Sequence, residues 1–376
     1  MEAILYIGIS QTLFAGILIA VKRPRMLANQ ILSAWLLLIC IEMIIALVNE
    51  TLVELYPIKI LPYTYGPLLL LYARRMTTEH PVFAPRFLYH FAPFFVFLIA
   101  SLVFIDERVM SGTDGFLVID RFVSFRIVYA ITFFVSITAY SIATFVVIHR
   151  HQKRLKQLVS YSSGKITLQW LLGLSITFYT GYVVMFIFGG VDIMMGFMPF
   201  DPYEISFIGL TIITFLFTIF GFNQPSIFEE VVKEKEIVKE PLEEDPADKK
   251  YQRSGLKQKD VERYKGIIGK YMVIEKPYLN RELTIYDLAA QLKIPRHFLS
   301  EVINEHLGKN FYTLVNDYRV EEVKRRIVDP AYKYLTILAI AYDSGFNAKS
   351  SFNTIFKEMT GMTPSEYQRS VTARDS

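Results

Sequence analysis

The chain has 376 residues, of which 52% are hydrophobic, and its formal net charge is +4. Its mean hydropathy of +0.32 is high for a soluble globular protein, and the single cysteine, Cys40, excludes an internal disulfide and a metal site built from several cysteines. Almost all of the apolar excess lies before residue 223. We therefore expect a membrane domain over 1–222, a linker over 223–256 and a soluble domain over 257–376.

Seven apolar stretches have the length that crosses a bilayer, since about 20 helical residues span a hydrocarbon core of about 30 Å. They lie near 3–21, 31–49, 58–76, 87–105, 126–149, 167–189 and 204–222. The third stretch is the least regular, because Pro62, Gly66 and Pro67 interrupt it. Such interruptions are tolerated where neighbouring helices satisfy the freed backbone groups. The pattern predicts a seven-helix transmembrane bundle.

Lysine and arginine predict the orientation of this bundle, because cytoplasmic loops carry an excess of both. The connections after the first, third and fifth stretches hold Lys22, Arg23, Arg25, Arg74, Arg75, Arg86, Arg150, Lys153, Arg154, Lys156 and Lys165. The other connections hold only Lys59, Arg108, Arg121 and Arg126, and they carry several acids. We therefore expect a multi-pass protein with its N-terminus outside and everything after residue 222 in the cytoplasm.

Glu42 lies in the middle of the second apolar stretch. An ionisable residue inside a membrane is costly and indicates function unless it is paired. Glu42 is therefore a candidate sensor residue that could bind a polar group of a ligand or relay a proton. The alternative is a protonated or paired carboxyl that faces the bundle interior.

Residues 223–256 form a charged connector that we expect to extend the seventh span as a helix to about Lys239, with Glu229 and Lys233 as an i,i+4 pair. Its apolar stripe is sparse, so a solvated helical stalk is favoured over a short dimerising coiled coil. The seventh span and residues 223–240 would then conduct a signal to the soluble domain. Pro241, Pro246 and Gly255 break the helix further on.

The soluble part reads as short helices separated by polar breaks, and the same design occurs twice, at about 283–308 and 335–361. In the first unit, Thr284 and Asp287 have the spacing of a capping box, and Leu288, Ala289, Leu292, Phe298, Leu299, Val302 and Ile303 are predicted to face the core. In the second unit, Thr336 and Asn347 are predicted helix caps, Gly345 a turn residue with positive φ, and Phe352, Ile355 and Phe356 core residues. Two helix-turn-helix units within 80 residues are a stronger signal than one.

Between the two units, "FYTLVNDYRVEEVKRRIVD" at 311–329 predicts one continuous amphipathic helix. Such a helix would be roughly 28 Å long at about 1.5 Å per residue. That length could hold two recognition helices about one DNA turn apart, roughly 34 Å, so that both enter the major groove on one face of the duplex. The soluble part is only mildly basic, with 19 Lys+Arg against 15 Asp+Glu, which permits nucleic-acid binding without requiring it.

Residues 280–369 resemble the DNA-binding domain of the AraC/XylS family of transcriptional regulators, most specifically in the segment "GF…SSFNTIFKEMTGMTPSEY". Lys293 and Pro295 depart from the family, which often has glycine and serine there. The membrane half, in "YTYGPLLLLYARRM", is similar to a segment of seven-span sensors found in some membrane-anchored members of this family. The resemblance implies an all-α protein that couples sensing to transcription.

The resemblance also implies which residues read DNA. The base contacts would come from Arg296, His297, Ser300, Glu301, Lys349, Ser350, Asn353 and Thr354. Lys349 suits guanine O6 and N7, Asn353 suits adenine, and Glu301 can accept a hydrogen bond from cytosine N4. Lys309 and Lys357 are expected to contact phosphates, which position a protein without reading sequence. For each residue the alternative is an ordinary solvated side chain.

These observations predict a membrane-anchored one-component regulator of the bacterial cytoplasmic membrane that couples an extracellular or intramembrane signal to gene expression. The output could be restrained access to DNA or altered dimer pairing. Its expected partners are double-stranded DNA, membrane lipid, an unidentified signal ligand and, by the resemblance, RNA polymerase; a homodimer stays open. The alternative is a transporter or receptor with an autoregulatory DNA-binding tail. No nucleotide-binding loop, kinase signature or metal-ligand cluster occurs, so we expect no enzymatic activity, catalytic residue, metal or cofactor.

Overall fold

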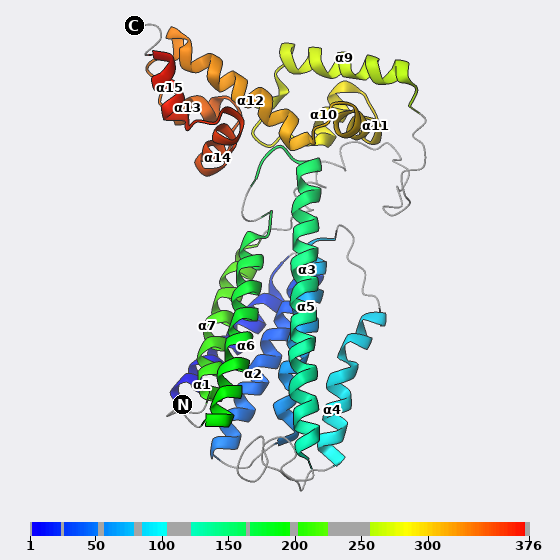
Figure 1. Ribbon diagram of the computed structural model, residues 1–376, viewed down its shortest axis with the longest axis vertical. Coiled ribbons are helices and arrows are strands. Elements are labelled where there is room, and N and C mark those ends of the chain that lie inside the picture. The colour runs from blue at the N-terminus through cyan, green and yellow to red at the C-terminus, as the bar shows by residue number, and fades with distance from the viewer. Residues whose placement is uncertain are drawn as a thin grey trace. The chain divides into compact units, whose positions relative to one another are not determined.

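The computed structural model describes residues 2–23, 26–51, 56–78, 85–103, 122–162, 166–195, 202–224 and 256–372 (Figure 1). These residues are helical apart from turns, loops and one isolated antiparallel bridge between Val159 and Thr284. The chain divides into two compact units, one of residues 1–150 and 168–239 and the other of residues 151–167 and 240–376. The second unit therefore includes residues 151–167, which in the sequence separate two long apolar segments of the first unit.

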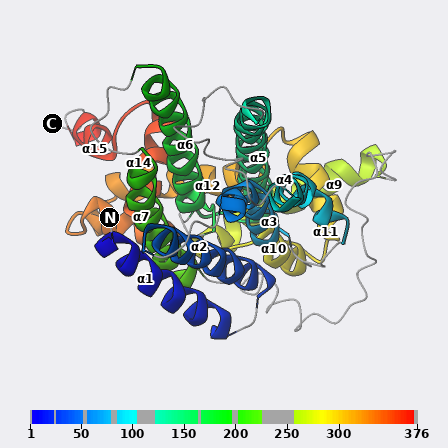
Figure 2. The same cartoon turned by 90° about the horizontal axis from the view of Figure 1, so that it is seen from below.

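The first unit contains the helices α1 (Glu2–Val21), α2 (Leu27–Thr51), η1 (Tyr56–Thr64), α3 (Tyr65–Met76), η2 (Pro85–Phe91), α4 (Ala92–Val103), α6 (Gln169–Met195) and α7 (Pro202–Asn223), with most of α5 (Val123–Leu158). Helix α1 packs on α2 and α7, and α6 also packs on α7; Figures 1 and 2 both show α1 and α2 side by side. Almost every residue of α3 is buried, so α3 lies inside this unit.

Five of these helices are long and apolar enough to cross a membrane. They are Glu2–Val21, Leu27–Val48, Val123–Leu158, Gln169–Val191 and Ile205–Asn223. Many large apolar side chains on them are exposed, among them Phe14 at 67% and Ile212 at 56%. Exposed apolar area of this kind is unfavourable in water and suits contact with lipid.

The third and fourth predicted spans are not single α-helices. Residues 56–64 form the 3₁₀ helix η1, which contains Pro62, before the 12-residue α3 begins. Proline lacks a backbone N–H and clashes with an α-helical turn, which explains the interruption. The fourth stretch likewise joins the 3₁₀ helix η2 to the 12-residue α4. Both stretches are therefore composite helices, and the irregularity expected of the third stretch is present.

Trp35 lies at the centre of the packing in the first unit, where it is 2% exposed. Its ring centroid lies 6.1 Å from that of Tyr65, 5.9 Å from Phe178 and 5.2 Å from Phe217. These contacts join α2 to α3, α6 and α7. Glu42 on α2 is also buried, and the Tyr65 hydroxyl donates a hydrogen bond to its carboxylate.

In chain order, the second unit contains the end of α5, α9 (Gln258–Ile274), η3 (Pro277–Leu279), α10 (Ile285–Leu292), α11 (Arg296–Glu301), the π-helical turn η4 (Val302–His306), α12 (Phe311–Val328), η5 (Pro330–Tyr332), α13 (Ile337–Asp343), α14 (Lys349–Thr360) and α15 (Pro364–Thr372). Helix α12 contacts η3 and η4 as well as α13, α14 and α15. It is continuous, as its periodicity predicts. The predicted stalk over 225–239 lies outside the described residues.

Candidate nucleic-acid interface

The first helix-turn-helix unit is α10, a short turn and α11. Thr284 and Asp287 form the predicted capping box, in which the Asp287 carboxylate accepts from the Thr284 N–H at 2.7 Å and the Thr284 hydroxyl accepts from the Asp287 N–H at 3.2 Å. Helix α10 ends at Leu292, and its C-cap residue Lys293 has a φ of 52°, in the left-handed region that glycine usually occupies. Pro295 then precedes α11 as its N-cap residue. The turn therefore forms despite both departures from the family pattern.

The second unit is α13, a turn and α14. The Thr336 hydroxyl caps α13 by accepting from the Ala339 N–H at 3.1 Å, as predicted. Gly345 has a φ of +97°, also as predicted. The prediction for Asn347 is wrong: α14 begins one residue later, with Ala348 as an N-cap that makes no side-chain hydrogen bond. An exposed helix N-terminus has free N–H groups that suit a phosphate.

A single apolar cluster holds α13 and α14 against α12. Its buried members are Val320, Val323, Ile340, Ala341, Phe346, Phe352, Ile355 and Phe356. Phe352 lies between its neighbours, with ring centroids 5.1 Å from Phe346 and 5.6 Å from Phe356. Because this apolar face of α14 is buried, its opposite face is turned to solvent.

The residues predicted to contact bases differ in exposure between the two units. On α14, Lys349, Ser350, Asn353 and Thr354 are all exposed. On α11, His297 is exposed, Arg296 and Ser300 are half-buried, and Glu301 is buried at 8% exposed. The Arg296 guanidinium lies over the Tyr286 ring, 5.2 Å from its centroid. The four α14 side chains therefore share one accessible surface, whereas those of α11 do not.

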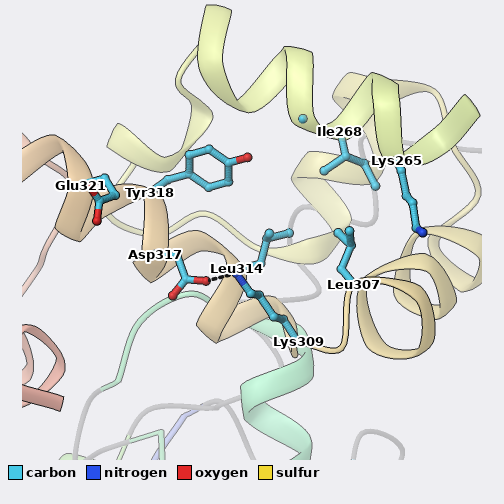
Figure 3. A pocket seen from close by; sticks show the side chains of 9 residues that line it. Lys265, Ile268, Leu307, Lys309, Leu314, Asp317, Tyr318 and Glu321 are labelled. Carbon is cyan, nitrogen blue, oxygen red and sulfur yellow. Dashed lines mark ion pairs between the residues drawn. The ribbon is translucent and has the colours of Figure 1, made fainter. Parts of the chain in front are cut away.

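The two lysines predicted to contact phosphates also have different surroundings. Lys357 on α14 is exposed. The Lys309 ammonium pairs with the Asp317 carboxylate at 2.6 Å and lines a pocket of about 280 Å³ beside α9 and α12, together with Ile268, Leu307 and Leu314 (Figure 3). A phosphate contact from Lys309 would have to compete with Asp317.

Sequence reasoning did not identify Arg319, a buried arginine on α12 whose guanidinium joins three segments of the second compact unit. Arg319 is 1% exposed, and its guanidinium donates to the carbonyls of Tyr278 at 2.8 Å, Asn280 at 2.7 Å and Ser160 at 2.8 Å. A signal exists in the sequence, because Arg319 lies one turn from both Val315 and Val323 on the apolar face of α12. A charge on a buried face requires partners.

A second buried charge on α12, Glu322, is held by three cations. Its carboxylate accepts from Arg325 at 2.7 Å, Arg326 at 2.7 Å and Lys276 at 3.2 Å. Burial by itself raises the pKa of Glu322, but these three hydrogen bonds outweigh burial and lower the pKa to about 2. Glu322 thereby links α12 to the end of α9, since Lys276 follows that helix.

Comparison with known proteins agrees with this geometry. Residues 288–370 match the family described as a helix-turn-helix domain. Over 98 residues, 26% of this chain, the sequence is 26% identical to a protein of Pseudoalteromonas carrageenovora named "Uncharacterized HTH-type transcriptional regulator in cgkA 5'region". The chain spans about half of that relative, 55% of its length. No solved structure matches the chain.

The fold and these matches define the class: the chain carries a helix-turn-helix domain of the DNA-binding regulator type over residues 288–370. Among the residues that the structure describes, five apolar helices have membrane-spanning length.

Proposed function

We propose that this protein is a membrane-anchored, sequence-specific transcriptional regulator of the AraC/XylS type. The observation that carries the proposal is the placement of two helix-turn-helix units on one continuous helix, α12, of 18 residues. At about 1.5 Å per residue this helix is about 27 Å long, close to the roughly 34 Å between successive major grooves on one face of DNA. Both units could therefore engage one side of a duplex.

Base reading would be concentrated on α14. Lys349 and Asn353 are exposed on the helix that a buried apolar cluster fixes in place, and their side chains suit guanine and adenine in the major groove. Ser350 and Thr354 complete that surface, while Arg296, His297 and Ser300 would provide the contacts of the first unit. A base contact from Glu301, which is 8% exposed, would require its side chain to leave the buried position. Lys357 and Lys309 would position the domain on phosphates.

Two features support membrane anchoring through seven spans. The five long helices are apolar and carry exposed apolar side chains. The composite of η1 and α3 has nine 3₁₀ and 12 α-helical residues, a length of about 36 Å at about 2.0 and 1.5 Å per residue. A composite helix can thus also cross a core of about 30 Å. The distribution of lysine and arginine favours a cytoplasmic C-terminal domain.

Glu42 is proposed as part of the sensor site, because its buried carboxylate has the Tyr65 hydroxyl as a partner inside the apolar unit. A signal that changed this pair would act on the contact between α2 and α3. RNA polymerase contact follows from the family resemblance, and an unidentified signal ligand belongs to the same proposal, which leaves a homodimer open. Within the described part of the chain, no structural observation favours a transporter or receptor with an autoregulatory tail.

The decisive experiment selects genomic DNA fragments with the full chain reconstituted in lipid nanodiscs. We expect a defined site with two short elements about one helical turn apart. Lys349→Ala or Asn353→Ala should relax specificity at one element, with a loss of about 1–3 kcal/mol for the preferred base. Lys270→Ala, which removes an exposed charge from α9, is the matched control. Enrichment without any sequence preference would contradict the proposal.

A further inference from the structure

Ser160, which lies just beyond the end of α5, is held by the helix-turn-helix domain through all of its polar groups. Its backbone N–H and its hydroxyl donate to the Leu283 carbonyl at 3.1 and 2.7 Å. Its carbonyl accepts from Arg319 at 2.8 Å and from Asn316 at 3.1 Å. The Arg319 guanidinium also donates to its hydroxyl at 3.0 Å. Ser160 is 1% exposed, so these bonds are made in the protein interior.

The two preceding residues extend this contact. Val159 pairs with Thr284 in the isolated antiparallel bridge, and Leu158 and Val159 are both buried. Residues 158–160 are therefore named the docking segment. The segment is separated from Leu283 by more than 120 residues of sequence, and it belongs to the same compact unit as α9–α15. The Val159 N–H still donates to the Leu155 carbonyl of α5, whereas the backbone N–H and carbonyl of Ser160 are both satisfied by the helix-turn-helix side.

The docking segment contacts both the first helix-turn-helix unit and the helix that connects the two units. Leu283 and Thr284 immediately precede α10, whereas Asn316 and Arg319 lie on α12. Arg319 also binds the carbonyls of Tyr278 and Asn280, so three segments meet at one guanidinium. Loss of the docking segment would remove one hydrogen bond from the buried Asn316 amide, two from the Arg319 guanidinium and two from the Leu283 carbonyl. This loss would loosen α10 from α12.

We propose that the docking segment is a regulatory contact that sets the orientation of the first helix-turn-helix unit relative to α12, and that its release changes DNA binding. The segment is the direct continuation of α5, Val123–Leu158, one of the five helices of membrane-spanning length. A displacement of α5 would therefore move the docking segment directly, because the two are covalently continuous. This route is distinct from the seventh span and the residues after it. The inference rests on the proposed function, because a change in DNA binding has meaning only if the domain reads DNA.

Docking is tested by thiol accessibility in the full chain in native membranes. Because Cys40 is the only cysteine, Cys40→Ser provides a thiol-free background for Ser160→Cys and, as the matched control, Gln157→Cys at an exposed position in the last turn of α5. A buried thiol reacts only from an opened state, so maleimide labelling at position 160 should be at least about tenfold slower than at position 157. Equal rates would overturn the docking contact.

Coupling is tested with Ser160→Ala, which removes the hydroxyl, and Ser160→Leu, whose side chain is too large for the site and cannot hydrogen-bond. Genome-wide DNA occupancy and promoter output are compared with wild type and Gln157→Ala, with membrane abundance measured on the same samples. We expect both Ser160 variants to change occupancy at least about threefold and Gln157→Ala to leave it unchanged. If wild type occupies defined sites and neither Ser160 variant changes occupancy, the coupling is wrong and the proposed function stands. If wild type occupies no defined site, the proposed function fails, whatever the thiol rates show.

Discussion

Arg319 carries its positive charge into the interior of the helix-turn-helix domain, where water cannot solvate it. Burial lowers the pKa of Arg319 to about 10, so the side chain is still protonated at neutral pH and needs acceptors. Its planar guanidinium has five N–H donors. The carbonyls of Tyr278, Asn280 and Ser160 each accept a hydrogen bond from a different guanidinium nitrogen. A lysine has the charge without that geometry.

Arg319→Lys should therefore lower the free energy of unfolding of the helix-turn-helix domain by about 2–3 kcal/mol, because it leaves buried carbonyls without donors. Pulse proteolysis of the full chain in urea measures this free energy. The control Arg263→Lys changes an exposed arginine on α9, paired with Asp260 at 3.3 Å, and should cost less than about 0.5 kcal/mol. Equal effects of both substitutions would show that the Arg319 fork is dispensable.

Gly345 is required for two separable reasons. Its φ of +97° is unfavourable for any residue with a side chain. A Cβ there would also overlap the Tyr278 carbonyl and lie 2.8 Å from the Arg319 Nε. Gly361, by contrast, has a φ of +75° but open space around the position of a Cβ.

The pair Gly345→Ala and Gly361→Ala separates backbone strain from steric overlap. Gly361→Ala should cost about 1 kcal/mol, the strain of a left-handed alanine. Gly345→Ala should cost at least about 2 kcal/mol more, since the turn must move away from Tyr278. Urea midpoints from the same proteolysis assay give both values. Similar losses of unfolding free energy for the two variants would mean that the turn at residue 345 can shift to avoid the overlap without destabilising the domain.

At the scale of elements, α14 is positioned by its buried face, and the proposed DNA contacts lie on its exposed face. Lys349 and Lys357 both lie on α14 and are both exposed, yet their expected roles differ. A base contact discriminates between sequences, whereas a phosphate contact contributes equally to all of them.

Lys357→Ala should weaken binding about equally for target and random DNA and reduce the salt slope, log K against log [salt], by about 1. Lys349→Ala should weaken target binding more than random binding. Fluorescence titrations of the full chain in nanodiscs over a range of salt concentrations measure both quantities. The assignment of roles would be reversed if Lys357→Ala reduced the preference for target DNA.

The stability of helix α12 depends on pH through the ionisation of Glu322. The folded-state pKa of about 2 lies below the ordinary value of 4.5, so the stabilisation is complete above about pH 4.5 and is lost as the pH falls toward 2. The shift corresponds to about 2 kcal/mol, allowing for solvent screening of the half-exposed Arg325 and Lys276.

Glu322→Gln should therefore remove about 2 kcal/mol of stability at pH 6 and progressively less between pH 4.5 and 2. Urea unfolding of wild type and variant across that range gives the difference directly. Glu321→Gln is the matched control, because Glu321 is 66% exposed and pairs only with Lys324 among the contacts described for it. A difference that does not shrink at low pH would exclude ionisation of Glu322 as its cause.

At the scale of the whole molecule, five and seven membrane spans both place the C-terminal domain on the side opposite the N-terminus. The two arrangements differ only in the side reached by the connection between α3 and α4. That connection follows Thr78 and is cytoplasmic with seven spans but external if α3 and α4 do not cross.

Alkaline phosphatase fusions after Thr78, Ser111 and Lys153 distinguish these topologies, since the enzyme is active only outside the cytoplasm. With seven spans, we expect activity only in the fusion after Ser111. The fusions after Ser111 and Lys153 behave identically in both topologies and serve as controls. Activity after Thr78 would reduce the membrane anchor to five spans.

The helix caps and turns of this protein were predictable because each depends only on residues that are close together in the sequence. The capping box of Thr284 and Asp287, the cap at Thr336 and the turn at Gly345 each depend on four residues or fewer. Asn347 was predicted as a cap for the same reason, and the structure starts α14 one residue later. Phe298 was expected in the core and is only half-buried, because a short helix such as α11 defines its apolar face poorly.

The sequence by itself determined the two helix-turn-helix units and the continuous α12, since hydrophobic periodicity and caps are local properties. Only the tertiary structure decided that η1 and α3 form a composite helix with α3 buried, that Glu301 is buried while the α14 residues are exposed, and that Ser160 meets Arg319. The last contact joins residues 159 positions apart. No local pattern encodes such a pair, because the guanidinium selects carbonyls by their position in the folded chain.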